Sequence, residues 1–243
     1  PAGAVNVICG RGGDAGAALA GHRDVNQIVF TGSVPTGIAI ATAAAQNVVP
    51  CVLELGGKSA AIVHDDADLA AFETDIRWGI YFNAGQVCSA MSRVIVHESR
   101  VEELLDRAEK VARSLSVGPG VERTAFGPNM GAMVSDAQRD RAIAMVANAE
   151  ADGARVVTGG RKLNRSGAFM EPTVLADVTP DMTIANEEVF GPDLSVMRFR
   201  DEAEAIAIAN GTDYGLVAGV FTADLDRATH AARALRAGQV FVN

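Results

Sequence analysis

The sequence predicts an α/β fold with a mainly parallel sheet. Short runs rich in β-branched residues alternate with stretches of helical periodicity, which is the pattern of repeated strand–helix–strand units. The chain has 243 residues, 49% apolar and 21% charged, which is enough for one large or two smaller packed units. The sequence contains no internal repeat and no low-complexity linker.

The predicted strands are short apolar runs bounded by turn residues. They cover 5–9, 27–30, 52–55, 60–63, 94–97, 155–158, 194–199, 217–221 and 239–243. Helical patterns at 14–20 and 36–46 separate the first three strands. This first stretch therefore has the alternation of part of a doubly wound sheet, and the later strands continue it.

Three later helices are predicted from their start signals. Each has a Ser or Asp followed three residues on by Glu or Gln, which fits a capping box. The pairs are Ser99 with Glu102, Ser135 with Gln138, and Asp201 with Glu204. After the first pair, apolar residues recur at helical spacing up to Leu115, and Gly118–Pro119 is expected to stop that helix.

Composition excludes several classes of partner. A net charge of −9 without a Lys/Arg block argues against nucleic acid and anionic membranes. No apolar run approaches the ~18 residues of a spanning helix, and the start of the chain does not read as a leader. Three cysteines without framework spacing predict reduced thiols and a cytoplasmic location. We expect no metal site.

A cysteine in a run of small and polar residues is the strongest chemical signal. Cys88 lies in F-N-A-G-Q-V-C-S-A at 82–90, and Glu54 opens E-L-G-G-K-S upstream. A thiolate is a good nucleophile, and a Glu can accept the proton that such chemistry releases. Cys9 and Cys51 instead lie in apolar runs and are predicted in strand cores, whereas Cys88 is predicted in a polar loop or at a helix start. A buried Cys and a surface Glu are the alternative interpretation.

Two glycine-containing turns are candidates for binding an anion. Residues 10–16, G-R-G-G-D-A-G, open a helix after a predicted strand, where amides and the helix dipole favour phosphate. Their spacing departs from the dinucleotide fingerprint, and no acidic residue ends the next strand. On this evidence alone, a packing turn is the simpler interpretation. Gly32 and Ser33, in F-T-G-S, also precede a helix.

A third stretch, N-E-E-V-F-G-P at 186–192, would by itself indicate a surface loop closed by Gly-Pro. Taken together and in this order, the motifs resemble the aldehyde dehydrogenase superfamily. The resemblance implies that Cys88 is the nucleophile and Glu54 the general base. It also implies that Glu188 binds the nicotinamide ribose and that Phe190 packs beside the nicotinamide.

The resemblance implies NAD or NADP as cofactor and a small-molecule aldehyde as substrate. Further cofactor-binding positions would be Gly12, Gly16, Gly32, Ser33, Leu55 and Gly56. Residues 1–56 would form the C-terminal part of an NAD(P)-binding domain of Rossmann type, and 57–243 an α/β catalytic domain without its C-terminal end. The turns at 32–37 and 85–89 are similar to those of betaine and amino-aldehyde members. A full-length form is expected to be a homo-oligomer, a dimer or tetramer.

Two other functions stay open at this point. Because family members are longer, their upstream oxyanion Asn and adenine-ribose Lys have no counterpart here. The chain alone is therefore expected to bind NAD(P) weakly, and a non-catalytic fragment or binding module is the first alternative. A cysteine hydrolase ranks last, since none of the four histidines lies in a matched motif.

Overall fold

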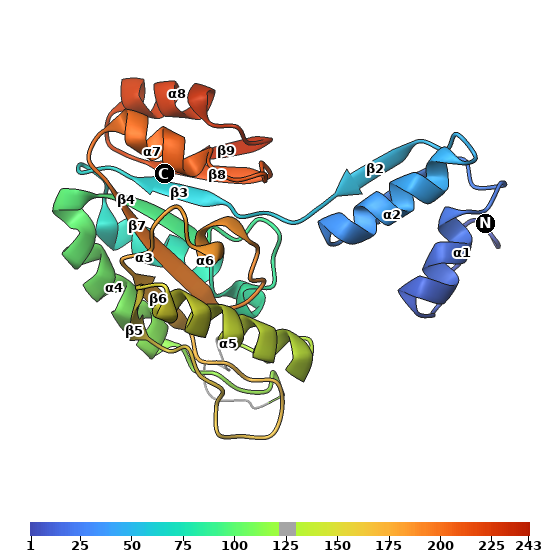
Figure 1. The fold of residues 1–243 in the computed structure, drawn as a ribbon, viewed down its shortest axis with the longest axis horizontal. Coiled ribbons are helices and arrows are strands. Elements are labelled where there is room, and N and C mark those ends of the chain that lie inside the picture. The colour runs from blue at the N-terminus through green and yellow to red at the C-terminus, as the bar shows by residue number, and fades with distance from the viewer. Residues whose placement is uncertain (122–129) are drawn as a thin grey trace. The chain divides into compact units, whose positions relative to one another are not determined.

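The computed structural model describes residues 1–121 and 130–243. They form two compact units, Pro1–Gly56 and Gly57–Asn243, each with its own sheet (Figure 1). The predicted α/β class with mainly parallel strands is confirmed in both units.

The first unit is a small parallel strand–helix–strand arrangement. Its elements in chain order are the π-helix η1 (Gly12–Gly16), α1 (Ala17–Ala20), β1 (Ile28–Thr31), α2 (Val34–Ala45) and β2 (Cys51–Glu54). Strands β1 and β2 pair in parallel, with Thr31 opposite Glu54. Pro35 favours the start of α2, because the first helical amides have no intrahelical partner to lose.

The strand predicted at 5–9 is wrong. These residues adopt no regular structure, and Val5, Val7, Ile8 and Cys9 are all exposed. A β-branched run becomes a strand only where a neighbouring strand supplies ladder hydrogen bonds, and in the described part of this unit β1 pairs with β2 alone. Cys9 is therefore not a core residue here, contrary to the prediction, while Cys51 lies in β2 and is partly buried.

The second unit contains a seven-stranded sheet in the order β5-β6-β7-β4-β3-β8-β9. All neighbours are parallel except β5 and β6. The strands are β3 (Ala60–Val63), β4 (Arg93–His97), β5 (Arg155–Thr158), β6 (Thr173–Ala176), β7 (Asp193–Phe199), β8 (Val217–Phe221) and β9 (Gln239–Val242). The predicted strands match these within one residue at each end, except that the sequence did not indicate β6.

Helices cover both faces of this sheet. They are α3 (Leu69–Gly79), α4 (Val101–Ser114), α5 (Asp136–Ala151), α6 (Thr183–Asn186), α7 (Glu202–Ala209) and α8 (Leu225–Ala234). In the strand order, the connection from β3 to β4 moves toward β5, whereas the connections from β7 to β8 and from β8 to β9 move toward β9. Right-handed crossovers therefore place α3 on one face and α7 and α8 on the other, as Figure 1 shows.

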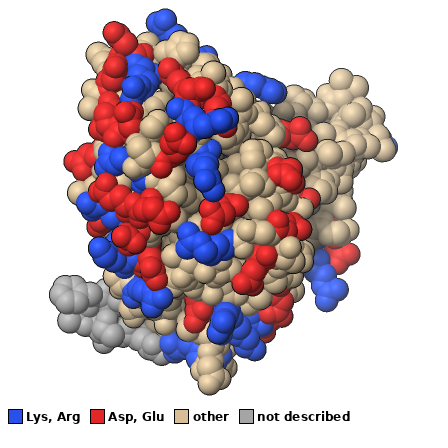
Figure 2. All heavy atoms as spheres, turned by 60° about the vertical axis from the view of Figure 1, so that its left-hand side comes forward, with Lys and Arg blue, Asp and Glu red and all other residues tan. Residues whose placement is uncertain are grey.

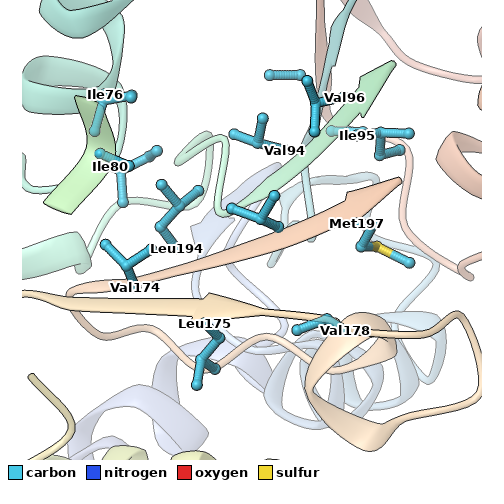
Figure 3. Close-up of a cluster of buried hydrophobic side chains, with 14 of the residues drawn as sticks. Ile76, Ile80, Val94, Ile95, Val96, Val174, Leu175, Val178, Leu194 and Met197 are labelled. Carbon is cyan, nitrogen blue, oxygen red and sulfur yellow. The ribbon is translucent and has the colours of Figure 1, made fainter. Parts of the chain in front are cut away.

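One part of the core lies where α3 meets the central strands. Figure 3 shows Ile76 and Ile80 beside Val94 of β4, Leu194 of β7 and Val174 of β6. All five side chains are buried, and each contributes about 1.5–3 kcal/mol of transfer free energy. Because β3 and β8 are buried at every position, successive side chains on both faces are covered, which explains their continuous apolar runs.

The outer surface of α4 is charged. Arg107 pairs with Glu73 and Glu103, and Arg113 pairs with Glu109. On the face drawn in Figure 2, basic and acidic side chains are interspersed. Within the described ranges, no helix combines the length and the apolar character needed to cross a bilayer.

The three predicted capping boxes differ in outcome. Ser135 and Asp201 accept from the amides of Gln138 and Glu204, as expected. The return half of each box is not formed as predicted: the Gln138 side chain donates to loop carbonyls, and the Glu204 side chain accepts from the Arg200 amide. Ser99 does not cap α4: it lies in the 3-10 turn η3 (Glu98–Arg100), and its hydroxyl bonds to His97 Nδ1 at 2.8 Å. The extra turn moves the helix start to Val101. The helix also ends at Ser114, before Gly118–Pro119.

This difference predicts the stability of two variants. Asp201→Ala removes a side-chain cap from α7 and should lower the free energy of unfolding by about 1 kcal/mol. Ser99→Ala should cost clearly less, because Ser99 caps no helix. Urea unfolding followed by circular dichroism measures both, and an equal loss in the two variants would contradict the capping assignment.

Candidate active site

Three segments distant in sequence enter neighbouring strands. Gly57 precedes β3, Cys88 precedes β4 and Glu188 precedes β7, and these strands are adjacent in the order β7-β4-β3. Because the strands are parallel, their amino ends lie at one edge of the sheet. The topology therefore gathers the three segments at that edge.

Cys88 lies in a turn, as the polar-loop prediction required, and not at a helix start. The turn follows the 3-10 segment η2 (Phe82–Gly85), in which Asn83, Ala84 and Gly85 all have φ between 52° and 71°. Three successive left-handed residues reverse the chain sharply, which is costly for residues other than Gly. The Asn83 and Gln86 side chains stabilise the reversal by bonding to each other's backbone carbonyls at 3.0 Å.

Gly57 joins the cysteine turn to Glu188. Its amide donates to Glu188 Oε1 at 3.2 Å. A β-carbon on Gly57 would overlap the Cys88 carbonyl oxygen, so only glycine allows this approach. The predicted nucleophile and the predicted ribose ligand thus contact the same residue.

A second glycine contact fixes the turn against the loop 187–192. A β-carbon on Gly85 would overlap the carbonyl oxygen of Gly191 and lie 2.8 Å from Pro192 N. Gly85 also has φ +71°, a conformation that other residues adopt only with strain. Both features require glycine at this position.

Helix α5 holds the loop that carries Glu188 and Phe190. Gln138 Nε2 donates to the carbonyls of Val189 and Phe190 at 3.0 and 3.1 Å. Arg141 donates to the carbonyls of Val189 and Glu188 at 3.1 and 3.2 Å. From the sequence, Gln138 is expected in a helix cap and Arg141 has no predicted role. No local signal reveals these contacts, because the partners lie about fifty residues further along the chain.

Burial dominates the electrostatics of Glu188. It raises the pKa of this half-buried carboxyl above its ordinary 4.5, although the Gly57 amide, Lys58 and Arg141 act in the opposite direction. The protonation of Glu188 therefore depends on the balance between its burial and these neighbouring groups. Within residues 1–121 and 130–243, no three His, Cys, Asp or Glu side chains are arranged to hold a metal ion.

The remaining predicted positions belong to the first unit. Glu54 is the last residue of β2, and its carbonyl accepts from the Gly32 amide at 3.0 Å. Leu55 packs against Gly37 of α2. Ser33 is the N-cap residue of α2, but its hydroxyl bonds to Thr36 Oγ1 at 2.9 Å instead of a backbone amide.

The predicted cofactor-binding glycines of residues 10–16 differ from Gly57 and Gly85. Gly12 and Gly16 lie in η1 with open space where a β-carbon would be, and Gly56 ends the unit. The protein itself therefore sets no steric requirement for glycine at Gly12 and Gly16, and the cofactor role of these positions stays a prediction.

Comparison with known proteins supports the motif analysis. The family model for the aldehyde dehydrogenase family matches residues 1–243. The chain belongs to the aldehyde dehydrogenase family. It is 44% identical to peroxisomal aminoaldehyde dehydrogenase 1 of Pisum sativum and 45% identical to a betaine aldehyde dehydrogenase of Sinorhizobium fredii. All of this chain is aligned in both cases, with 48% and 50% of the relatives.

Solved aldehyde dehydrogenases share this fold. The NAD-dependent enzyme from Sinorhizobium meliloti aligns with a TM-score of 0.94 and 39% identity over 98% of this chain and 47% of its own. The NAD+ complex of the Bacillus cereus enzyme aligns with a TM-score of 0.92 and 40% identity over 96% and 47% of the two chains. The chain thus spans about half the length of the relatives it matches.

The Gly85 contact predicts a large effect from a small substitution. Gly85→Ala should lower the free energy of unfolding by at least about 2 kcal/mol, because it adds left-handed strain and an overlap with the Gly191 carbonyl. Gly79→Ala is the matched control, since Gly79 ends α3 with open space around the added methyl group. It should stay within about 1 kcal/mol of the parent. Equal urea midpoints for the two variants would contradict the close contact.

The raised pKa of Glu188 predicts a pH dependence. The folded chain holds this proton more tightly than the unfolded chain, so the contribution is fully present below pH 4.5 and is lost as pH rises through the raised pKa. The free energy of unfolding of the parent minus that of Glu188→Gln should therefore fall from below pH 4.5 toward neutrality. Urea titrations across this range measure the difference, and a rise with pH would mean that the pKa is lowered instead.

Proposed function

We propose that this chain supplies the catalytic part of an aldehyde dehydrogenase that oxidises an aldehyde to a carboxylic acid with NAD(P)+. The observation that carries the proposal is the contact of Gly57 with both the Cys88 carbonyl and the Glu188 carboxylate. A nucleophile and a cofactor ligand need such proximity if a hydride is to move between their bound groups. Family membership and the NAD+ complex of the Bacillus cereus relative support it.

The residues present suit a nicotinamide cofactor. Glu188 uses Oε1 for the Gly57 amide, and its second oxygen can accept from a ribose hydroxyl. Phe190, held in a left-handed conformation with φ 55°, would pack beside the nicotinamide ring. In residues 1–56, which would be part of the NAD(P)-binding domain, α2 starts at Ser33–Val34 and its amino end would favour the pyrophosphate. Bound NAD(P)+ would accept the hydride.

The chain's own residues would perform the covalent steps. The Cys88 thiolate attacks the carbonyl carbon, a C–S bond forms, and the carbonyl oxygen becomes an oxyanion beside the Cys88 backbone amide. Loss of the hydride restores the C=O bond and leaves a thioester. Glu54 then takes a proton from water, the hydroxide adds to the acyl carbon, and the C–S bond breaks to release the carboxylic acid and the thiolate.

The class of aldehyde is proposed from aromatic side chains near the cysteine turn. Trp78 and Phe82 are 62% and 55% exposed, with ring centroids 6.3 Å apart. Exposed aromatic faces attract ammonium groups. Relatives named for aminoaldehydes and betaine aldehyde match the chain at 44% and 45% identity, so we propose an amino- or ammonium-aldehyde.

The histidine positions disfavour a cysteine hydrolase. His64 and His97 lie at or just after the carboxyl ends of β3 and β4, whereas Cys88 precedes β4. A histidine base must lie within hydrogen-bond reach of the thiol, and these two are at the opposite edge of the sheet. The homo-oligomer and cytoplasmic location stay predictions, and the relatives include peroxisomal and chloroplastic proteins.

The proposal predicts distinct kinetics for three sets of variants. NADH absorbance is followed after mixing protein, NAD+ and an aminoaldehyde. Cys88→Ser should lower the rate of NADH formation at least about a hundredfold, because the nucleophile is lost. The control variants Cys9→Ser and Cys51→Ser should keep the parental rate. Glu54→Gln should keep a first burst of NADH and lose steady-state turnover, since its role comes after hydride transfer.

Two outcomes would contradict these assignments. Normal turnover in Cys88→Ser would remove Cys88 from the chemistry, and normal steady-state turnover in Glu54→Gln would remove Glu54. A folded parent chain without any NADH formation would favour the non-catalytic alternative.

A further inference from the structure

A buried ion pair connects two of the segments that enter the site. Lys58 directly follows Gly57, and Asp193 directly follows Pro192. Their side chains are 0% and 1% exposed, and Lys58 Nζ lies 3.9 Å from Asp193 Oδ2. In the described part of the chain, neither Nζ nor either carboxylate oxygen makes a hydrogen bond. A buried charge without a partner is very costly, so each side chain depends on the other.

The pair spans the entry to β4. Ala60 of β3, Arg93 of β4 and Ser195 of β7 are aligned across the sheet. Lys58 and Asp193 each lie two residues before this line. Lys58 precedes β3, and Asp193 is the first residue of β7, the two strands that flank β4. Those strands are about 10 Å apart, a distance that a lysine side chain helps to bridge. The two side chains therefore meet across the entry to β4, where the chain runs on from the Cys88 turn.

Hydrogen bonds hold the backbone at both ends of the pair. Arg93 Nε donates to the Lys58 carbonyl at 2.8 Å, and its other nitrogens donate to the carbonyls of Ile208 and Ala209 at the end of α7. At the other end, the Asp193 amide donates to the Gly191 carbonyl at 2.9 Å. A shift of either charged side chain would therefore be transmitted to Gly57 or to the loop 187–192.

We propose that Lys58 and Asp193 form a positioning pair that holds the Gly57 amide on Glu188 and Gly57 against the Cys88 carbonyl. The inference rests on the proposed function for the roles of Glu188 and Cys88, but its geometry is independent of them. Lys58 also lowers the pKa of Glu188.

The charged and titratable groups that act on the pair are few. Arg93 lowers the pKa of Lys58, and Glu188 raises it. Burial and the charge of Asp193 both raise the pKa of the Tyr81 hydroxyl. Burial lowers the pKa of Lys58 and raises that of Asp193.

The test measures amide hydrogen exchange at Gly57 by mass spectrometry of the whole chain, together with urea unfolding. Asp193→Asn leaves Lys58 unpaired and should both destabilise the chain and speed exchange at Gly57. The double variant Lys58→Met/Asp193→Leu removes both charges, so it should unfold near the parental urea concentration. It should nevertheless exchange Gly57 at least tenfold faster, because the positioning force is gone. The pH dependence assigned to Glu188 should also move to higher pH, because the nearby positive charge is lost.

Arg113→Ala is the control. It breaks a shorter ion pair with Glu109, at 2.7 Å, whose arginine is 66% exposed, and it should leave Gly57 exchange unchanged. Parental exchange at Gly57 in the double variant would overturn the inference, because packing alone would then hold the contact. A double variant that does not fold would also overturn it, since the pair would then support the whole unit. These readouts need neither aldehyde nor cofactor, so they stand even if the chain shows no turnover.

Discussion

Parallel pairing of β3, β4 and β7 is the constraint on which the candidate site depends. Gly57, Cys88 and Glu188 are distant in sequence, yet each lies just before one of these three adjacent strands. In open α/β sheets, ligands usually bind at the carboxyl ends of the strands. Here the motif residues gather at the amino ends, and His64 and His97 lie at the other edge. The register of the sheet therefore determines which chemistry is within reach of the thiol.

The contacts at this edge are made largely by backbone. Gly57 approaches the Cys88 carbonyl, and Gly85 approaches the Gly191 carbonyl, at distances that exclude any side chain. Such contacts orient amides and carbonyls with little freedom, which suits a site that must place a nucleophile against a bound group. Gln138 and Arg141 also hold the backbone, because they donate hydrogen bonds to the carbonyls of the loop 187–192 and not to its side chains.

Buried charged side chains lie next to these backbone contacts. Lys58 and Asp193 are buried with each other, and Arg93 is buried against three carbonyl groups. Burying these groups is costly, and their placement at the starts of β3, β4 and β7 concentrates that cost where the site is assembled. The half-buried Glu188 is close enough for its pKa to respond to Lys58. Packing and chemistry are thus coupled at one edge of the sheet.

The sequence by itself determined the α/β class, most strands and the motifs of the family. Periodicity is a local property, so runs such as 60–63 and 217–221 were predicted with their observed limits. Local patterns failed where the outcome depends on a partner. Residues 5–9 have strand-forming side chains, but no strand among the described residues pairs with them, and an extra 3-10 turn displaces Ser99 from its cap.

Only the tertiary structure decided what surrounds the motif residues. It brought Gly57 to Cys88 and Glu188, Gln138 to the loop 187–192, and Lys58 to Asp193. The Asp at 193 and the Gln at 138 carry no local signal for these roles, since their partners lie 51 or more residues away along the chain. Contacts at such separations are set by strand order and register, which local sequence patterns do not encode.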